Sequence, residues 1–427
     1  MKKSNTIRIL GVDKLKNIDV LSASVMFSCV NIEYMNLRIT GLQTLTFYMR
    51  LFLIVIIAVR SIFTNLQYRN IIVFGRNMFF VLAFLGIVLW TSFYNNRNVE
   101  QTFFDLSYAL LPALYLDYYR DSLKLVSIIK TWEIYLLVLV GIDAVTMFLF
   151  PSGLYSTNSY TLNWFLGYKT MRLIYALPLC IFRVMLNYFF DEKRKGKTYG
   201  VLLLTTFTLV YSRASAAAIG LIVIFMLFIA YDALVNLYWG KKRIGQSINK
   251  AIAAFMSNYI WILPIYFAVF YLLLNISHSF LAQQFVSKVL NKDITLTNRT
   301  VLWSACVDLI WKKPMFGYGY MTADDNRILF NNMYYTSPHN MVLSVFMTAG
   351  IIGAVFYLIS IIDSLRTLHK RDNVISRILV LGILCNLLVG ITSSVLVFSV
   401  CGFIFNVLSE TDFEKLKMKI NLKKIKK

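Results

Sequence analysis

The chain has 427 residues, of which 58% are hydrophobic and only 15% are charged. A soluble domain carries about 25% charged residues, so this composition excludes an ordinary water-soluble protein. The net charge of +22 would suit a protein that binds nucleic acid. Lys and Arg stand in short blocks between apolar runs, however, which is how membrane proteins fix their orientation. We therefore expect a lipid bilayer and no nucleic acid as partner.

Twelve apolar runs approach the length of about 20 residues that a helix needs to cross the hydrocarbon layer. In chain order, the expected spans are Val20–Ile32, Leu42–Val59, Met78–Phe93, Phe104–Tyr118, Thr131–Phe150, Met171–Phe190, Gly200–Tyr211, Ala214–Leu237, Tyr259–Leu274, Met341–Leu365, Ile378–Ile391 and Ser394–Leu408. This pattern predicts an all-α polytopic membrane protein with about 12 transmembrane helices, built as a single membrane domain over residues 1–427.

Positive charge gives this arrangement an orientation, because short loops rich in Lys and Arg stay in the cytoplasm. Most of the 43 Lys and Arg residues fall in alternate segments between the expected spans. These segments are Lys2–Lys16, Arg60–Arg76, Arg120–Lys130, Lys193–Lys197, Lys241–Lys250, Arg366–Arg377 and Lys415–Lys427. The alternation predicts that the protein lies in a bacterial cytoplasmic membrane with both termini in the cytoplasm. It places the long loop 275–338 on the outer face.

The long outer loop 275–338 is expected to be partly helical. Thr297 or Asn298 can cap a helix whose apolar residues recur at helical spacing. The cations and proline of Lys312–Pro314 end this helix, since cations favour the last turn and proline blocks continuation. The aromatic turn Phe316–Tyr320 follows, and its rings suit the faces of sugars. Packing of the same rings against the membrane explains the turn equally well.

A histidine stands at the end of the outer loop, in Ser337–Asn340, directly before the apolar run from Met341. Ser is a good N-cap and Pro suits the first helical position, so His339 is expected in the first turn of a transmembrane helix. The helix dipole there disfavours imidazolium, and a neutral ring can accept a proton. His278 and His369 are less well placed for outer-face chemistry. His339 is therefore the candidate catalytic residue, with a purely structural role as the alternative.

Three arginines accompany this histidine at predicted outer helix ends. Arg213 begins a helix of small residues, and Arg299 begins the loop helix. Helix N-termini attract phosphates, and guanidinium groups bind phosphate oxygens bidentately. Arg213, Arg299 and His339 thus predict a site for the diphosphate of a membrane-embedded lipid, with Arg172 as a third cation. Snorkelling to the lipid headgroups is the alternative explanation for Arg213.

Other charged residues fall inside expected spans, where a charge at the bilayer centre costs about 2.5–3.5 kcal/mol on insertion scales. They are Arg50, Glu133, Asp143, Arg183 and Asp232. Such charges can form a proton or ion path, but no recurring pattern links them. We expect buried pairs instead, with Asp143 and Arg183 on successive spans as one candidate.

Several short motifs follow one another along residues 199–365. They are Ser-Arg-Ala-Ser at 212–215, Asn-Arg-Thr-Val-Leu-Trp at 298–303, Lys-Pro-Met-Phe-Gly-Tyr-Gly at 313–319, Pro-His-Asn at 338–340 and Ala-Gly-Ile-Ile-Gly at 349–353. Each motif is short, but their order, spacing and predicted membrane side together are specific. In these features the chain resembles the O-antigen ligase/polymerase superfamily, the Wzy-like and WaaL-like membrane glycosyltransferases.

The resemblance implies a GT-C-like, metal-independent enzyme that needs no cofactor and takes an undecaprenyl-pyrophosphate-linked oligosaccharide as donor. It implies that Arg213 and Arg299 hold the pyrophosphate and that His339 acts at the acceptor hydroxyl. Asn340, from the same Pro-His-Asn motif, is taken as a further substrate-binding residue. The segment before Arg172 departs from the family's glycine- and asparagine-containing pattern, which leaves the role of this arginine open.

The function expected from the sequence is polymerisation of lipid-linked polysaccharide repeat units, as for O-antigen, capsule or exopolysaccharide. The glycan would pass from undecaprenyl pyrophosphate to an acceptor sugar hydroxyl with inversion. An O-antigen ligase acting on lipid A core shares this machinery and remains an alternative. A flippase or transporter of the same lipid-linked oligosaccharide is the alternative from another class, although repeated halves and charges along a central path would be expected of it. A flippase and a chain-length regulator are further expected partners of the polymerase.

Overall fold

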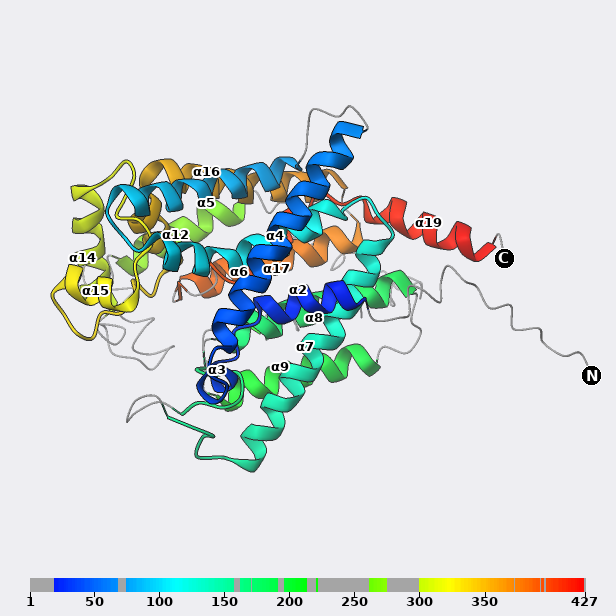
Figure 1. Cartoon of the computed structure of the whole chain (residues 1–427), viewed down its shortest axis with the longest axis horizontal. Helices are drawn as coiled ribbons and strands as arrows, with labels where there is room; N and C mark the ends of the chain where they lie inside the picture. The colour runs from blue at the N-terminus through cyan, green and yellow to red at the C-terminus, as the bar shows by residue number, and fades with distance from the viewer. Residues whose placement is uncertain are drawn as a thin grey trace, which may run out of the picture.

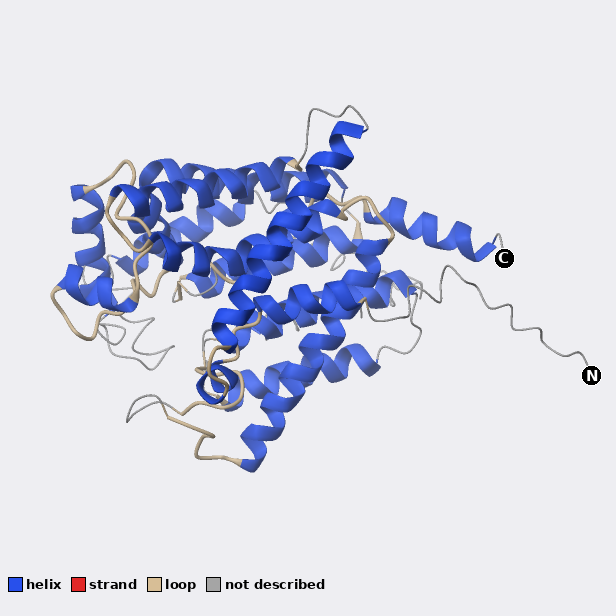
Figure 2. Ribbon diagram, viewed as in Figure 1, coloured by secondary structure: helices blue, strands red, loops and turns tan. Residues whose placement is uncertain are grey.

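All the regular elements in the part of the chain that the computed structural model describes are helices (Figure 2). The structure describes residues 19–67, 74–156, 162–169, 171–190, 196–212, 220–221, 261–274, 299–371, 373–391, 393–394 and 397–425. Within them, β-pairing is limited to isolated bridges between Tyr155 and Asn163 and between Trp164 and Gly167. The all-α fold expected from the sequence is therefore confirmed.

The helices follow the apolar runs of the sequence, because a helix satisfies all its own backbone groups where water is absent. In chain order they are α2 (Val20–Cys29), α3 (Glu33–Arg38), α4 (Leu42–Gln67), α5 (Arg76–Tyr94), α6 (Val99–Tyr118), α7 (Lys124–Leu149), α8 (Arg172–Phe190), α9 (Gly196–Tyr211), α12 (Ile262–Leu274), α14 (Arg299–Lys312), α15 (Ala323–Phe330), α16 (Met341–Arg371), α17 (Val374–Gly390), α18 (Cys401–Leu408) and α19 (Phe413–Ile425). Helices α14 and α15 lie within 275–338, so this loop is partly helical as predicted.

Five of the described helices are long and apolar enough to cross a membrane, namely α4, α5, α7, α8 and α16. The chain is thus a multi-pass membrane protein. The count of about 12 spans stays a prediction, because the expected span Ala214–Leu237 falls almost entirely outside the described residues.

Two expected spans are shorter in the structure than in the prediction. Helix α2 has 10 residues and α18 has 8, which gives α18 a length of about 12 Å, less than half of the hydrocarbon layer. The residues from Ser394 were expected to be helical, but α18 begins only at Cys401. Hydroxyl side chains such as those of Ser393 and Ser394 compete for backbone groups and weaken a helix.

The helix ends gather at two opposite ends of the molecule. In Figure 1, α14 and α15 lie at the left end and α19 lies at the right end. At the α19 end, Arg120 forms ion pairs with Asp117 and Glu410. At the α14 end, Arg97 forms an ion pair with Asp325. These contacts join segments that the charge pattern assigns to the same side of the membrane. Which end faces the cytoplasm stays a prediction.

Helix α16 is interrupted at Gly350, where φ is 60°, a left-handed value that glycine adopts without strain. An unsatisfied backbone group at membrane depth costs several kcal/mol, so such a break needs partners from elsewhere. The loop segment Pro314–Gly319 supplies them through four backbone hydrogen bonds. The bonds run from Tyr318 N–H to Met347 O (2.7 Å), from Gly319 N–H to Thr348 O (3.0 Å), from Ile351 N–H to Pro314 O (2.8 Å) and from Ile352 N–H to Met315 O (3.2 Å).

This α16 junction, formed by Pro314–Gly319 and Met347–Ile352, explains two of the glycine motifs. The backbones approach so closely that a side chain on Gly317 would collide with Met347 O. Just after the junction, Tyr320 N–H donates to Ser92 Oγ of α5 (2.8 Å). The junction therefore fixes where the segment Pro314–Tyr320 lies on the bundle.

Candidate functional site

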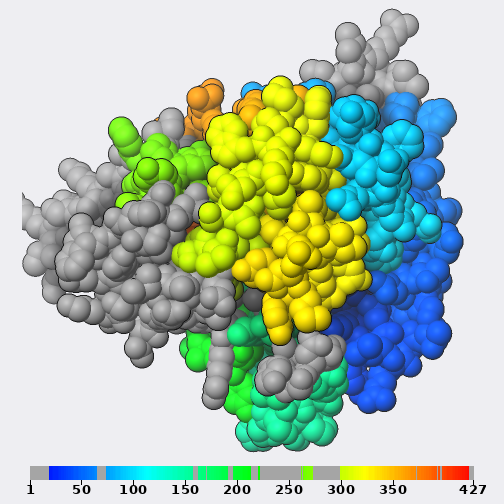
Figure 3. Space-filling model, turned by 90° about the vertical axis from the view of Figure 1, so that its left-hand side faces the viewer, coloured from blue at the N-terminus to red at the C-terminus, as the bar shows by residue number. Residues whose placement is uncertain are grey.

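The loop helix α14 is anchored to the segment that carries His339. Trp303 is fully buried, and its Nε1–H donates to the carbonyl oxygen of Pro338 (3.0 Å). Arg299 begins α14 about one turn before Trp303, so the same anchor holds Arg299 near this segment. Figure 3 shows the α14–α15 segment, in yellow, covering the middle of this end of the molecule. In the sequence, Trp303 is only part of a short motif, and its anchoring role depends on the tertiary contact with Pro338.

His339 lies just before α16 rather than in its first turn, which corrects the sequence-based prediction. Its φ of 49° is left-handed and incompatible with a helical position. Asn340 is placed to cap the helix instead, since its side-chain oxygen accepts from Leu343 N–H (3.0 Å) and its amide donates to Ile391 O (2.8 Å). Asn and Ser are equally good caps, so the sequence could not separate Asn340 from Ser337. The fully buried Asn340 thus uses both polar side-chain atoms within the fold.

The His339 imidazole is half-buried and contacts Ser337, whose Oγ lies 3.1 Å from Nδ1. When Nδ1–H donates to this hydroxyl, Nε2 keeps a lone pair that can accept a proton. Burial, together with the positive charge of Arg299, lowers the pKa of His339 from 6.5 to about 4. The ring is therefore neutral near pH 7. The neutral ring had been expected from a helix dipole, whereas its causes in the structure are burial and a neighbouring cation.

Arg299 lies close enough to His339 for its charge to act on the imidazole, so these two predicted site residues share one region. Burial lowers the pKa of the Arg299 guanidinium, and the phenol of Tyr168, in the loop before α8, raises it. The planar guanidinium fork matches two phosphate oxygens. A cation beside a neutral base suits a reaction in which an anion leaves and a hydroxyl attacks.

Arg172 lies in different surroundings. Its side chain is only 1% exposed and forms an ion pair with Asp143 of α7 (2.8 Å). Asp143 also accepts a hydrogen bond from Leu166 N–H (2.8 Å), and the Arg172 guanidinium carbon lies 5.1 Å from the centroid of the Trp164 ring. Asp143 was expected to pair with Arg183, which pairs instead with Glu133 (3.5 Å).

One predicted member of the site is the arginine of the Ser-Arg motif. Arg213 lies outside the described residues, as do Ala214 to Ala218 of the helix predicted to follow it. Ser212 is described at the end of α9, where its hydroxyl donates to Leu209 O (2.9 Å). The shared site of Arg213, Arg299 and His339 thus has two described members, and Arg213 stays a prediction.

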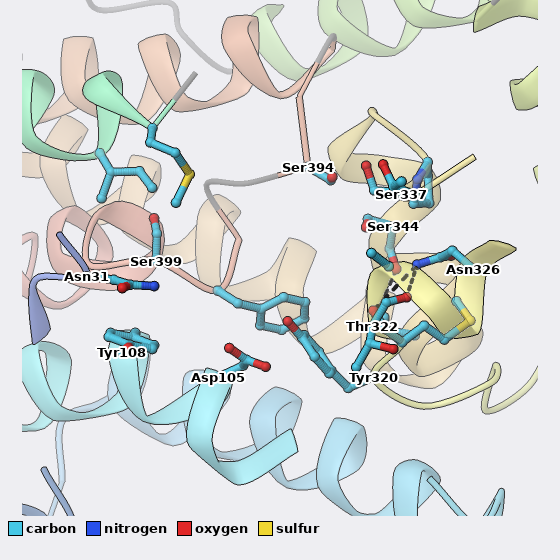
Figure 4. A pocket seen from close by; sticks show the side chains of 18 of the residues that line it. Asn31, Asp105, Tyr108, Tyr320, Thr322, Asn326, Ser337, Ser344, Ser394 and Ser399 are labelled. Atoms are coloured by element: carbon cyan, nitrogen blue, oxygen red, sulfur yellow. Dashed lines mark hydrogen bonds between the residues drawn. The ribbon is translucent and has the colours of Figure 1, made fainter. Parts of the chain in front are cut away.

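A polar cavity of about 330 Å³ opens beside Ser337 and Pro338. Its described lining comes from the end of α2, from α6, α8 and α16, from residues 320–338 and from the segment before α18. Figure 4 shows Asp105 and Tyr320 close together, with Tyr108, Asn31 and Ser399 on one side and Ser337, Ser344 and Asn326 on the other. Asp105 was missed by the sequence analysis because a single carboxylate at the edge of an apolar run carries no pattern.

The two short helices make room for this cavity. Helix α2 ends at Cys29 and α18 begins after Val400, and both of these residues line the cavity. Non-helical backbone at membrane depth is tolerated where it lines a cavity or is buried in protein. The helices α2 and α18 are therefore short because the chain beside them lines the cavity instead of continuing as a helix.

Among the described residues, no group of three or more His, Cys, Asp or Glu side chains is placed to hold a metal ion. Residues 199–358 match the family model of the O-antigen ligase, and this segment includes Arg213, Arg299 and His339. No curated protein and no solved structure matches the chain significantly. Proteins of the matched family are membrane ligases and polymerases of the glycosyltransferase type. Over residues 199–358, this match supports the resemblance of the chain to the O-antigen ligase/polymerase superfamily.

Proposed function

We propose that this protein is a polymerase of lipid-linked polysaccharide repeat units, which moves a glycan from undecaprenyl pyrophosphate to the hydroxyl of an acceptor sugar. The observation that carries the proposal is the Arg299 cation beside the neutral His339 imidazole, at the end of the molecule where α14 and α15 lie. A base and an anion-binding group at one place are what this transfer needs. The site would lie at the outer face of the cytoplasmic membrane, with both termini inside.

The reaction would proceed by one direct displacement. Nε2 of His339 takes the proton of the acceptor hydroxyl while its oxygen bonds to the anomeric carbon of the donor. The bond from this carbon to the pyrophosphate oxygen breaks, and the anomeric configuration inverts. Arg299, together with Arg213, balances the negative charge that develops on the departing lipid pyrophosphate. In this mechanism guanidinium groups take the part that a metal ion plays in other transferases.

Two further predicted site residues receive structural roles in this proposal. Asp143 cancels the charge of Arg172, which weakens the case for Arg172 as a pyrophosphate ligand. Both polar side-chain atoms of Asn340 form hydrogen bonds within the protein, to Leu343 and Ile391, so we do not propose a contact between Asn340 and substrate. A ligase would use the same chemistry and differ only in its acceptor, lipid A core. A flippase that supplies the donor and a chain-length regulator are proposed as protein partners.

The test is transfer by the purified protein in liposomes, with lipid-linked repeat units as the substrate. We expect His339→Ala to lower the rate of polymer formation at least about a hundredfold, since general base catalysis contributes this much or more. His369→Ala is the matched control, because His369 lies in the last turn of α16, at the opposite end of this helix from His339. Polymerisation by His339→Ala at the wild-type rate would refute the assignment.

Two additions to the same assay separate the finer claims. A chelator such as EDTA should leave the rate unchanged if the transfer is metal-independent, and a lost rate would contradict that claim. Lipid A core, offered alongside the repeat unit, should receive no glycan from a polymerase. Its preferential modification would identify a ligase.

A further inference from the structure

The polar cavity has a lining whose chemistry differs from that of the Arg299–His339 site. Asp105 is the one carboxylate among the described lining residues, and neither Lys nor Arg is among them. The other polar groups are hydroxyls and side-chain amides, from Tyr108, Tyr320, Asn31, Asn326 and several Ser and Thr residues. A desolvated phosphate or carboxylate would find no cation in this lining, so the cavity does not suit an anion. Hydroxyls and amides suit the hydroxyl groups of an uncharged sugar.

Aromatic rings, including those of Tyr320 and Phe398, form part of the cavity lining. Tyr320 and Phe398 lie edge to face with ring centroids 5.5 Å apart, and Phe398 stacks on Phe84 of α5 at 6.0 Å. These contacts hold the Tyr320 ring in place, and Figure 4 shows this side chain close to Asp105. The Asp105 carboxyl also accepts from the Gln101 side-chain amide (2.8 Å). A carboxylate held by the Gln101 amide beside an aromatic ring is preorganised for a polyol ligand.

The buried cation Arg50 lies next to the cavity-lining residue Tyr108. Arg50 is fully buried, with its guanidinium carbon 3.7 Å from the Tyr108 ring centroid and its Nε–H donating to Ser107 Oγ (2.7 Å). It is not among the residues that line the cavity. It therefore offers a ligand in the cavity no direct contact.

We propose that this cavity is the subsite for the acceptor sugar, and that Asp105 and Tyr320 make it selective for uncharged over acidic sugars. The inference rests on the proposed function, because the cavity begins at Ser337, which contacts the His339 ring. An acceptor sugar bound beside Ser337 and Pro338 would therefore lie next to the segment that carries His339. The volume of about 330 Å³ is at the small end of ligand pockets, which fits a short stretch of glycan.

The experiment measures sugar binding directly, without turnover. The full chain in lipid nanodiscs is titrated with methyl N-acetylglucosaminide, an uncharged probe, and with methyl glucuronide, an acidic probe, and saturation-transfer NMR reports binding. We expect the uncharged probe to bind about tenfold more tightly, the equivalent of one hydrogen bond to a charged group. Asp105→Asn should bring the ratio of the two affinities close to one. Equal binding of both probes to the wild type would overturn the inference.

Asp324→Asn is the matched control, since Asp324 follows the lining residue Ala323 in α15 but is itself absent from the lining, and its side chain is 81% exposed. This variant should keep the wild-type ratio, and a ratio shifted as in Asp105→Asn would count against a role of the cavity. Tyr320→Phe, which keeps the ring and removes the hydroxyl, should weaken the uncharged probe by a smaller factor than Asp105→Asn.

Turnover separates this inference from the proposed function. In the liposome assay, Asp105→Asn should raise the KM for the acceptor about tenfold and change kcat little, as expected for lost binding energy. If the wild type transfers no glycan but shows the Asp105-dependent preference, the proposed function fails and the sugar subsite stands. If it transfers glycan and Asp105→Asn changes neither the affinity ratio nor KM, the subsite inference fails alone.

Discussion

Arg172 and Arg299 each stand at the first residue of a helix, α8 and α14, yet their surroundings are opposite. Arg172 is buried against Asp143, which cancels its charge. Arg299 acts on the imidazole of His339 and lowers its ability to hold a proton. An arginine paired with a buried carboxylate holds helices together, whereas an arginine whose charge acts on an imidazole changes the proton affinity of that ring. The comparison teaches that position at a helix N-terminus does not by itself identify a phosphate ligand.

The largest effect on stability is expected when the buried ion pair between Asp143 and Arg172 is broken. Asp143→Ala leaves the buried Arg172 guanidinium without its carboxylate, which should cost about 3–5 kcal/mol of stability. Thermal unfolding in detergent measures the loss. Replacing both residues, as Asp143→Leu with Arg172→Met, should recover much of it, since apolar pairs of similar volume substitute well for buried ion pairs. If Asp143→Ala were as stable as the wild type, the ion pair would not hold α7 to α8.

The next effect concerns Arg299. Arg299→Ala should leave the fold in place but lower the rate of glycan transfer about 100–1,000-fold, the usual cost of losing one group that stabilises transition-state charge. Arg327→Ala is the matched control, since Arg327 lies in α15 and pairs with the exposed Asp324. A loss of stability without a change in the rate per folded molecule would make Arg299 a structural residue like Arg172.

The smallest effect is expected from loss of the hydrogen bond between Trp303 and Pro338, which joins the segments that carry Arg299 and His339. Trp303→Phe keeps most of the buried ring and removes only the hydrogen bond to Pro338 O, which should cost about 1–3 kcal/mol because a buried acceptor is left unpaired. The transfer rate should fall by more than the lost stability explains, because Arg299 and His339 are then held together less firmly. Trp311→Phe, at an exposed position of the same helix, should change neither quantity.

Much of the helix pattern was predictable, because apolar runs of membrane length impose helices almost without regard to tertiary context. The ends of α5, α7, α8 and α16 fall within a few residues of the expected spans or extend them. The short helices α2 and α18 were not foreseen, because apolar composition does not say whether a run is helical or lines a cavity. The break of α16 at Gly350 was equally invisible, since its partners come from a loop about 30 residues earlier in the sequence.

The candidate site was predictable in its residues more than in its geometry. His339 was predicted in the first turn of a helix and lies just before α16, because its cap, its neighbours and the origin of its low pKa depend on tertiary packing. The predicted pair of Asp143 with Arg183 was wrong, and the pair of Asp143 with Arg172 was not predicted. Spacing along two helices does not fix how the helices are rotated relative to each other. Asp105 and Tyr320 lie 215 positions apart and meet only through the α16 junction.

The coupling of Arg299 to His339 is tested most directly by the pH dependence of glycan transfer. The neutral imidazole is the active form, so wild-type activity should persist below pH 6 and fall only as the pH drops through the His339 pKa of about 4. In Arg299→Gln the neighbouring cation is absent, the His339 pKa rises towards its usual value, and activity should be lost at a higher pH than in the wild type. An acid limb at the same pH in both proteins would contradict the account.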